Sequence, residues 1–427
     1  MNIGRIFITG LFVLCCLLTN ALGNTVAPAL VAAPVKPESQ RLRWKGNTIR
    51  IAVSSSLTRV NSNIKTDSDV LGAIRRSLQA WASAADLDLQ LEFSDKQNVS
   101  PGGPAGDGVS LITIAQSPEN VLFFSKDAES ASAKTRIFFN RRGVITEADI
   151  VLNPFQQFST DGTFGTFDLE STLTHEIGHL LGLRHSGVLG ATMAESFARN
   201  GTMGLADLST RTLSESDVAA IRELYGASSI ENCCGAIAGK LSLNGGRPAK
   251  GLLVWAEVSE SARVMAQAET AADGTFRIGG LPDGEYSVYW NSKDNSSSMG
   301  ELGNLSVENG ESKTVNGKIV LRPSDAELEY IGLNGQLADY GISLSRGRTY
   351  LINLGGKNMD AVSRIVFNTP YLRIAPFSTG TSEFSEGVSG LSFLITVDPE
   401  IAAGQYSVMA GSGNGSKTSL IGAINVE

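Results

Sequence analysis

Hydrophobic and polar residues follow helical and strand periods along the first half of the chain, which predicts a mixed α/β region. Alternation at Ile49, Ile51 and Val53 predicts a strand, and residues 87–93 alternate in the same way. Between these strands, apolar residues recur every three or four positions and predict a helix that begins near Asp67. The apolar positions of this helix are Val70, Leu71, Ile74, Leu78 and Trp81.

Further strands and two capped helices complete this region. Residues 109–113 predict a third strand, and residues 137–139 and 148–152 flank a turn at Arg142-Gly143. Asp168 is placed to cap one helix, and Ser214 with Asp217 forms a capping arrangement for the last helix. That last helix buries its apolar face and stops at Gly226; the face consists of Val218, Ile221 and Leu224. We expect a twisted sheet packed on two long helices, with the helix capped by Asp168 underneath.

The pattern changes to all-β beyond residues 228–235, which predict a linker. Alternating apolar residues over 252–258 indicate a strand, and Asp273-Gly274-Thr275-Phe276 is a hairpin signal. Residues 280–288 then lead from a turn into a further strand. The large aromatic residues Trp255 and Trp290 are expected in the core rather than on a binding surface.

Length and charge restrict the classes of function. A chain of 427 residues is expected to hold two to four domains. The formal net charge of −8 and the pI near 5.2 argue against nucleic acid as a partner.

The first residues have the pattern of a secretory signal peptide. Arg5 precedes an apolar run over residues 6–18, and Ala21-Leu22-Gly23 is a small-residue cleavage site. We expect cleavage after Gly23, a flexible leader over residues 24–40 and a secreted protein. No other stretch is long and apolar enough for a transmembrane segment in the mature chain.

Four cysteines are present, and two of them, Cys15 and Cys16, would leave with the signal peptide. The remaining pair, Cys233-Cys234, could form a vicinal disulfide, bridge two chains or stay as buried thiols. The fold therefore does not depend on a disulfide framework.

All three histidines of the chain fall within eleven consecutive residues, 175–185, in the pattern H-E-x-x-H-x-x-G-x-x-H. His175 and His179 lie one turn apart on the same face of a helix, so both imidazoles can bind one ion. Gly182 can end the helix and return His185 to that ion, because glycine adopts left-handed backbone angles without strain. Three nitrogen ligands leave a fourth position for water, which is typical of a catalytic zinc site.

Glu176 projects about 100° around the helix from His175, beside the expected metal. A carboxylate there can act as a general base: it takes a proton from the water and passes it to a leaving amine. Met193, eight residues after His185, is predicted to lie under the zinc.

The histidine motif and its surroundings resemble the matrixins, the matrix-metalloprotease branch of the metzincin zinc peptidases. Residues 167–174 lead into the motif, Ser186 follows it, and residues 213–226 resemble the last helix of the family's catalytic domain. Arg43-Trp44 resembles the start of that domain, and the match covers residues 42–226. The resemblance implies an α+β metzincin domain with a twisted, mostly parallel five-stranded sheet and three helices. It also implies a secreted zinc endopeptidase with one catalytic zinc on His175, His179 and His185, Glu176 as general base and Met193 in the Met-turn.

The chain departs from the family pattern in three places. No histidine remains for a second, structural zinc, and no cysteine lies between residue 17 and the motif to block the metal. We therefore expect activity without removal of a pro-segment. Residues 193–197 replace the usual Pro-x-Tyr wall of the specificity pocket, so the resemblance does not give the pocket's depth. For calcium, Asp107-Gly108 and Asp161-Gly162 could supply loop ligands, but these pairs are more typical of plain turns.

Two β-sandwiches are predicted after the linker. Residues 236–321 resemble the carboxypeptidase-regulatory or transthyretin-like sandwiches, and residues 325–427 are similar to the immunoglobulin-like IPT group. Neither sandwich carries a catalytic constellation. We place the peptidase domain at residues 41–227 and the two all-β sandwich domains at 236–322 and 323–427.

The sequence as a whole predicts a secreted zinc-dependent metalloendopeptidase that binds its protein or peptide substrate as an extended strand. Residues 131–137 or residues 121–124 could form the strand that receives it. The alternative hypothesis is a surface or matrix adhesion protein. In that case the sandwiches would bind the partner, and the zinc domain would be slow or self-processing.

Overall fold

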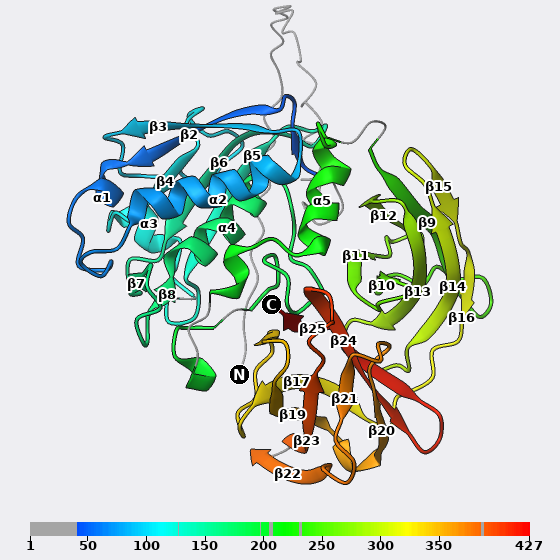
Figure 1. Cartoon of the computed structure of the whole chain (residues 1–427). Helices are drawn as coiled ribbons and strands as arrows, with labels where there is room; N and C mark the ends of the chain where they lie inside the picture. The colour runs from blue at the N-terminus through cyan, green and yellow to red at the C-terminus, as the bar shows by residue number, and fades with distance from the viewer. Residues whose placement is uncertain (1–40, 127, 197, 205–207, 230–232, 386–387) are drawn as a thin grey trace, which may run out of the picture.

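The computed structural model describes residues 41–427 except 127, 197, 205–207, 230–232 and 386–387. The expected signal peptide and leader lie outside the described residues. Three groups of elements follow one another along the chain (Figure 1). We refer to residues 43–226 as the first unit, residues 235–319 as the second unit and residues 327–426 as the third unit.

The first unit contains a six-stranded sheet in the order β1-β6-β4-β2-β3, with β5 paired to β6. Its strands are β1 (Arg43–Trp44), β2 (Thr48–Ser54), β3 (Asp88–Ser94), β4 (Leu111–Thr113), β5 (Ala133–Phe139) and β6 (Val144–Leu152). All of these pairs are parallel except β5 with β6. The sheet has one strand more than the five expected, because Arg43 and Trp44 pair with β6. A separate pair joins β7 (Phe158–Ser159) and β8 (Phe167–Asp168).

Three helices of the first unit have eleven or more residues. They are α2 (Val70–Ala84), α4 (Leu169–Leu180) and α5 (Glu215–Tyr225), and two short helices are α1 (Ser55–Thr58) and α3 (Pro118–Leu122). Helix α2 begins at Val70 and not near Asp67, because Asp67 has a positive φ of 73° and the Asp69 side chain caps the helix at Gly72. Single 3₁₀ turns lie at Thr202–Gly204 and Ser209–Arg211.

Helices α2 and α4 pack against each other beside the sheet and share one apolar core with it (Figure 1). Trp81 of α2 is fully buried, and its indole Nε1 donates to the carbonyl of Thr174 on α4 at 2.8 Å. Burial of an aromatic side chain of this size is among the larger single contributions to a core. Helix α4 is therefore held rigidly between α2 and the sheet.

The second unit has two four-stranded sheets with a shared apolar core. One sheet holds β11 (Val264–Glu269), β10 (Leu252–Val258), β13 (Gly284–Ser292) and β14 (Gly300–Val307). The other holds β12 (Thr275–Leu281), β9 (Gly235–Leu243), β15 (Ser312–Thr314) and β16 (Gly317–Ile319). The hairpin predicted at residues 273–276 is wrong: Gly274 does turn the chain, but β11 and β12 on either side belong to different sheets. As expected, Trp255 and Trp290 are buried.

The third unit also consists of two sheets over one core. The first contains β17 (Glu327–Leu333), β19 (Thr349–Lys357), β23 (Val388–Val397), β21 (Leu372–Ile374) and β22 (Gly380–Ser385). The second contains β18 (Ile342–Leu344), β25 (Lys417–Val426), β24 (Gly404–Ser412) and β20 (Val362–Val366), and a 3₁₀ turn lies at Met359–Ala361.

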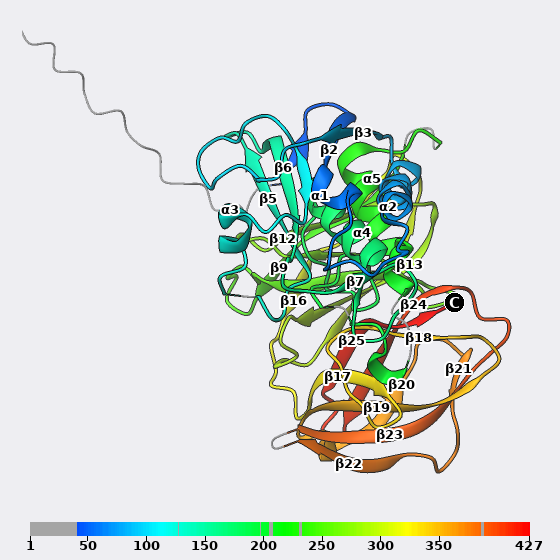
Figure 2. The same cartoon turned by 90° about the vertical axis from the view of Figure 1, so that its left-hand side faces the viewer.

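The three units pack directly on one another. Helix α5 of the first unit lies against β11 and β12, and Glu223 on this helix pairs with Arg277 of β12 at 2.8 Å. The third unit lies under the first, with β24 and β25 at the boundary (Figure 2). Between the first and second units, Cys233 and Cys234 are bonded to each other as a vicinal disulfide, one of the three alternatives for this pair. None of the described helices combines the length and apolar character that a bilayer crossing requires.

Candidate metal and peptidase site

Helix α4 places the first two histidines. Asp168 caps the helix as predicted, because its Oδ1 accepts a hydrogen bond from the backbone N–H of Ser171 at 2.8 Å. Arg211 in turn pairs with Asp168 at 2.5 Å, which fixes the cap. His175 and His179 follow one turn apart on the same face of the helix, in agreement with their spacing, and His175 is buried while His179 is half-buried.

The chain leaves α4 through Gly182, which has a φ of +100°. A Cβ atom at this position would lie 2.3 Å from the carbonyl oxygen of Leu42, so a side chain is excluded by contact as well as by conformation. The turn returns the backbone toward the helix, and Leu183 N–H donates to the Gly178 carbonyl at 3.0 Å. His185 is thereby brought back to the two helical histidines.

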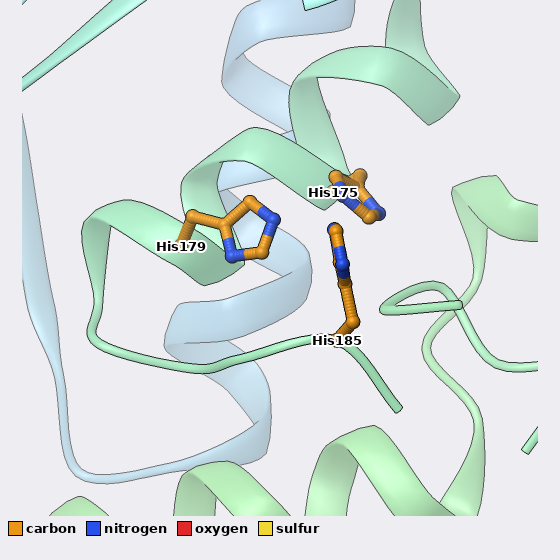
Figure 3. Close-up of side chains that lie close together, drawn as sticks. All are labelled: His175, His179 and His185. Atoms are coloured by element: carbon orange, nitrogen blue, oxygen red, sulfur yellow. The ribbon is translucent and has the colours of Figure 1, made fainter. Parts of the chain in front are cut away.

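The three imidazole rings face a common space (Figure 3). Their ring centroids are 4.7 Å apart for His175 and His179, 4.8 Å for His179 and His185, and 5.3 Å for His175 and His185. One nitrogen from each ring lies within 4.8 Å of the others, close enough for one ion to reach all three. Among the described residues, this trio is the one such group of three or more metal-ligating side chains.

Backbone carbonyls orient two of the rings. Nδ1 of His175 lies 2.8 Å from the Thr192 carbonyl, and Nδ1 of His179 lies 2.9 Å from the Leu183 carbonyl. Because a carbonyl can only accept, Nδ1 of each ring carries the proton and Nε2 keeps its lone pair. This is the tautomer in which a histidine binds zinc through Nε2 while its other nitrogen is held by a second partner. The residues present therefore fit a bound zinc ion.

The surroundings keep the imidazoles neutral. Burial lowers the pKa of His175 well below its ordinary value, with a further decrease from His179. Burial also lowers the pKa of His179. The pKa of His185 is lowered to about 4, mainly by desolvation and to a smaller extent by the neighbouring His179. A neutral imidazole is the form that coordinates a metal.

Glu176 is buried beside the histidines and points toward β5. The Thr135 hydroxyl donates to its Oε2 at 2.5 Å and lies 3.2 Å from its carbonyl oxygen. Burial raises the pKa of Glu176 to about 7, against smaller decreases from Thr135 and Lys134. A carboxyl group with a pKa near neutrality can both accept and return a proton.

Met193 lies directly under the histidine helix. A Cβ atom at Gly178 would be 2.3 Å from the Met193 sulfur, so the sulfur packs against the backbone between the two helical histidines. The loop that carries Met193 is fixed to the histidine motif, because Ser186 N–H donates to the Met193 carbonyl at 2.6 Å. Met193 thus forms the floor of the site, as its distance from His185 predicts.

Asp217 connects helix α5 to this floor. It completes the predicted capping box with Ser214, and its two carboxylate oxygens also accept from the backbone N–H groups of Thr192 at 2.8 Å and Met193 at 3.1 Å. The Thr192 carbonyl holds His175. One buried carboxylate therefore stabilises both the start of α5 and the loop that orients a histidine.

The histidines and Glu176 open into a cavity of about 680 Å³. One side of it is formed by residues 130–135, at the start of β5. In the described part of the chain β5 pairs with β6 alone, so its other edge can receive an extended peptide. The alternative edge at residues 121–124 is wrong, because Val121 and Leu122 belong to helix α3.

The two aspartates considered for calcium are both paired with lysines. Asp107 forms an ion pair with Lys96, and Asp161 pairs with Lys65 at 2.6 Å. Asp161 also accepts from the Thr163 N–H two residues on, a pattern typical of turns.

Several residues of the site could not be found from sequence motifs. Thr135 carries no pattern that predicts its contact with Glu176. The sequence predicts Asp217 as part of a helix cap, but nothing near it in sequence indicates its bonds to residues 192–193. The cavity is also lined by Asp339 and Tyr340, which belong to the third unit.

Replacing Gly182 by alanine is expected to lower the free energy of unfolding by about 3 kcal/mol, from the positive φ and from the clash with Leu42. Zinc affinity should fall with it, because His185 follows the turn. Urea unfolding and a zinc-competition titration measure the two effects. Gly226→Ala is the matched control, since Gly226 also has a positive φ but no neighbour within 4 Å of a Cβ. Equal losses in both variants would contradict the role of the Leu42 contact.

Comparison with solved structures finds partial overlaps with two pilins and a glucan-utilisation protein. The major pilin BcpA of Bacillus cereus overlaps at 13% identity and a TM-score of 0.19, covering 43% of this chain and 66% of the pilin. The pilin SpaD of Corynebacterium diphtheriae has 11% identity and a TM-score of 0.18, over 45% of this chain and 65% of that one. The glucan-utilisation protein SGBP-B of Bacteroides ovatus has 14% identity and a TM-score of 0.18, over 45% and 43%. The chain thus spans less than two thirds of each structure's length, and overlaps of this size do not establish a shared fold.

No curated protein matches the chain. A family model does match the region that carries the three histidines: residues 43–226 match the peptidase family described as Matrixin. This match supports a metallopeptidase and implies a catalytic zinc. Residues 43–226 are thus similar to the matrixin family of metallopeptidases, and His175, His179 and His185 within them are positioned to bind a metal.

Proposed function

We propose that the protein is a secreted zinc-dependent metalloendopeptidase, with zinc held by His175, His179 and His185 and with Glu176 as general base. The observation that supports this most strongly is the convergence of three neutral imidazoles on one space beside a buried carboxylate. Both features open into a cavity bounded by a strand edge. A structural zinc site would have no use for the carboxylate or for the open cavity.

Zinc, when bound, acidifies a water molecule and polarises a carbonyl oxygen. Glu176 then takes a proton from the attacking water and delivers it to the nitrogen of the leaving amine. Its raised pKa suits this double task, because the group must exchange a proton readily in both directions near neutral pH. Thr135 holds Oε2 of Glu176 and so sets the direction of the carboxylate.

The substrate is proposed to bind as an extended strand along β5. Its backbone would pair with residues 133–135, and the scissile bond would then lie over the histidines, since these residues line the same cavity. Hydrogen bonds between the substrate backbone and β5 do not depend on the side chains of the substrate. The strand edge therefore supplies affinity, and the remaining walls of the cavity select side chains.

A digest of a peptide library by the mature chain, with and without 1,10-phenanthroline, tests this function. We expect cleavage within peptides, loss of all cleavage with the chelator, and recovery when zinc is added back. Magnesium should not restore activity, because imidazole ligands favour zinc over magnesium. Cleavage that survives the chelator would contradict the zinc mechanism. A zinc-loaded chain that cleaves nothing would favour the alternative of a binding protein.

A further inference from the structure

The wall of the cavity is completed by a segment from the far end of the chain. Asp339 and Tyr340 lie between β17 and β18 of the third unit, yet they line the same cavity as the histidines and Glu176. Ser196, three residues after Met193, donates from its hydroxyl to Asp339 Oδ2 at 3.0 Å. On the basis of the proposed peptidase function, we propose that Asp339 and Tyr340, together with Glu195, determine substrate specificity by favouring a basic side chain.

The segment is attached to the loop that follows the third histidine. Gly341 N–H donates to the Leu189 carbonyl at 2.9 Å. Leu189 and Gly190 in turn donate to the carbonyls of Ile421 and Gly422, at 2.9 Å and 3.0 Å. Backbone hydrogen bonds therefore connect residues 189–190 with two separate stretches of the third unit.

Glycines make this close approach possible. A Cβ atom at Gly341 would lie 2.7 Å from the Cα of Gly190, and one at Gly190 would lie 2.8 Å from the Gly422 carbonyl oxygen. Gly422 itself has a φ of +56°, and its Cβ would lie 2.4 Å from Val188. Side chains at these three positions would separate the two backbones.

An apolar cluster shared by all three units lies beneath the contact. The first unit contributes Val188 and Ala191, and the other units contribute Leu253, Trp255, Val264, Met299, Met409 and Ile421. Trp255 is fully buried there, and its Nε1 donates to Glu257, which also accepts from Ser407 of the third unit at 2.8 Å. A joint core of this kind fixes the segment with Asp339 relative to His185.

The charges on this wall indicate which side chain it accepts. Glu195 and Asp339 are both exposed, and neither is paired with a lysine or arginine of the described residues, so both carboxylates can receive a cation from a ligand. The charge of Glu195 also acts on His185, and Asp339 accepts the hydrogen bond from Ser196. The cation among the described lining residues is Lys134, which lies on β5. Tyr340, which is half-buried, offers a ring on which the aliphatic stem of lysine or arginine can pack. A basic side chain would thus satisfy both the carboxylates and the ring.

Charge substitution at Asp339 in the full chain tests the proposal. The substrates are sets of peptides that carry Lys, Gln or Glu at one position and are otherwise identical. For each peptide, kcat/KM is measured with the unchanged protein and with the Asp339→Asn and Asp339→Lys variants. For the unchanged protein we expect kcat/KM to be about tenfold higher for the Lys peptide than for the Glu peptide at one position. Asp339→Asn should reduce this Lys-to-Glu ratio of kcat/KM about fivefold. Asp339→Lys should reverse the preference. Tyr340→Ala should raise KM for the Lys peptide and change kcat little.

The matched control is Asp360→Lys, an exposed aspartate on the same unit that does not line the cavity. It should leave the Lys-to-Glu ratio of kcat/KM unchanged.

Zinc content and the thermal midpoint are measured for every variant. In the Asp339 variants both should stay at the values of the unchanged protein, because Asp339 is exposed. If cleavage proceeds but the ratio is the same in all Asp339 variants, the specificity proposal is overturned while the peptidase function stands. If the unchanged, zinc-loaded protein cleaves no peptide, the proposed function fails and the specificity proposal falls with it.

Discussion

Replacing Glu176 by alanine is expected to reduce peptide hydrolysis by about 10²- to 10⁴-fold while the zinc content stays near one ion per chain. The three histidines and the carbonyls that orient them are untouched by this change. What is lost is the group that receives the proton of the attacking water. The measurement is kcat/KM on the best library peptide, together with zinc analysis of the purified protein.

Two further variants make the result specific. Glu176→Gln keeps the size of the side chain and its contact with Thr135 but removes the base, so its loss should be as large. Glu92→Ala removes an exposed glutamate on β3, at the opposite end of the sheet order from β1, and should leave activity unchanged. Activity retained by both Glu176 variants at full zinc occupancy would overturn the assignment of the general base.

Replacing Asp217 by alanine is expected to lower the free energy of unfolding by about 3–5 kcal/mol and to weaken zinc binding as well. The carboxylate accepts from the backbone N–H groups of Ser214, Thr192 and Met193, and all three donors would be left without it. Loss of the capping box adds to this cost. Zinc binding should weaken because the freed loop contains Thr192, whose carbonyl orients His175.

Urea unfolding gives the stability of the Asp217 variant, and zinc-competition titration gives its metal affinity. The matched control is Glu215→Ala, in the first turn of the same helix. Glu215 is partly exposed and pairs with Arg263 at 3.5 Å, so its loss should cost less than about 1 kcal/mol. An Asp217 variant that is destabilised but binds zinc with unchanged affinity would show that the loop does not depend on this carboxylate.

The local features of the site were predictable because they involve neighbours in sequence. The cap of α4 joins Asp168 to Ser171, and the capping box joins Ser214 to Asp217, so each closes within three residues. The spacing of His175 and His179 follows from helix geometry alone. The turn at Gly182 follows from the backbone freedom of glycine, and its φ of +100° agrees.

Turn chemistry predicted where the chain bends but not which strands pair. Asp273 and Gly274 do form a tight turn, yet β11 and β12 on its two sides join different sheets. In the same way, an apolar pattern at residues 121–124 was compatible with a strand, although Val121 and Leu122 lie in α3. Pairing depends on which surfaces meet across the core, and a short pattern contains no information on its distant partner.

The sequence by itself predicted the proposed chemistry of this protein: the candidate ligands, the candidate base and the helix that carries most of them, since all of these depend on residues within a few helical turns. Tertiary structure alone decided the surroundings of that chemistry. Thr135 reaches Glu176 across 41 residues, and Asp339 reaches Ser196 across 143. Contacts over such separations arise when whole units bury apolar surface against each other, as Val188 and Trp255 do, and no periodicity along the chain encodes them.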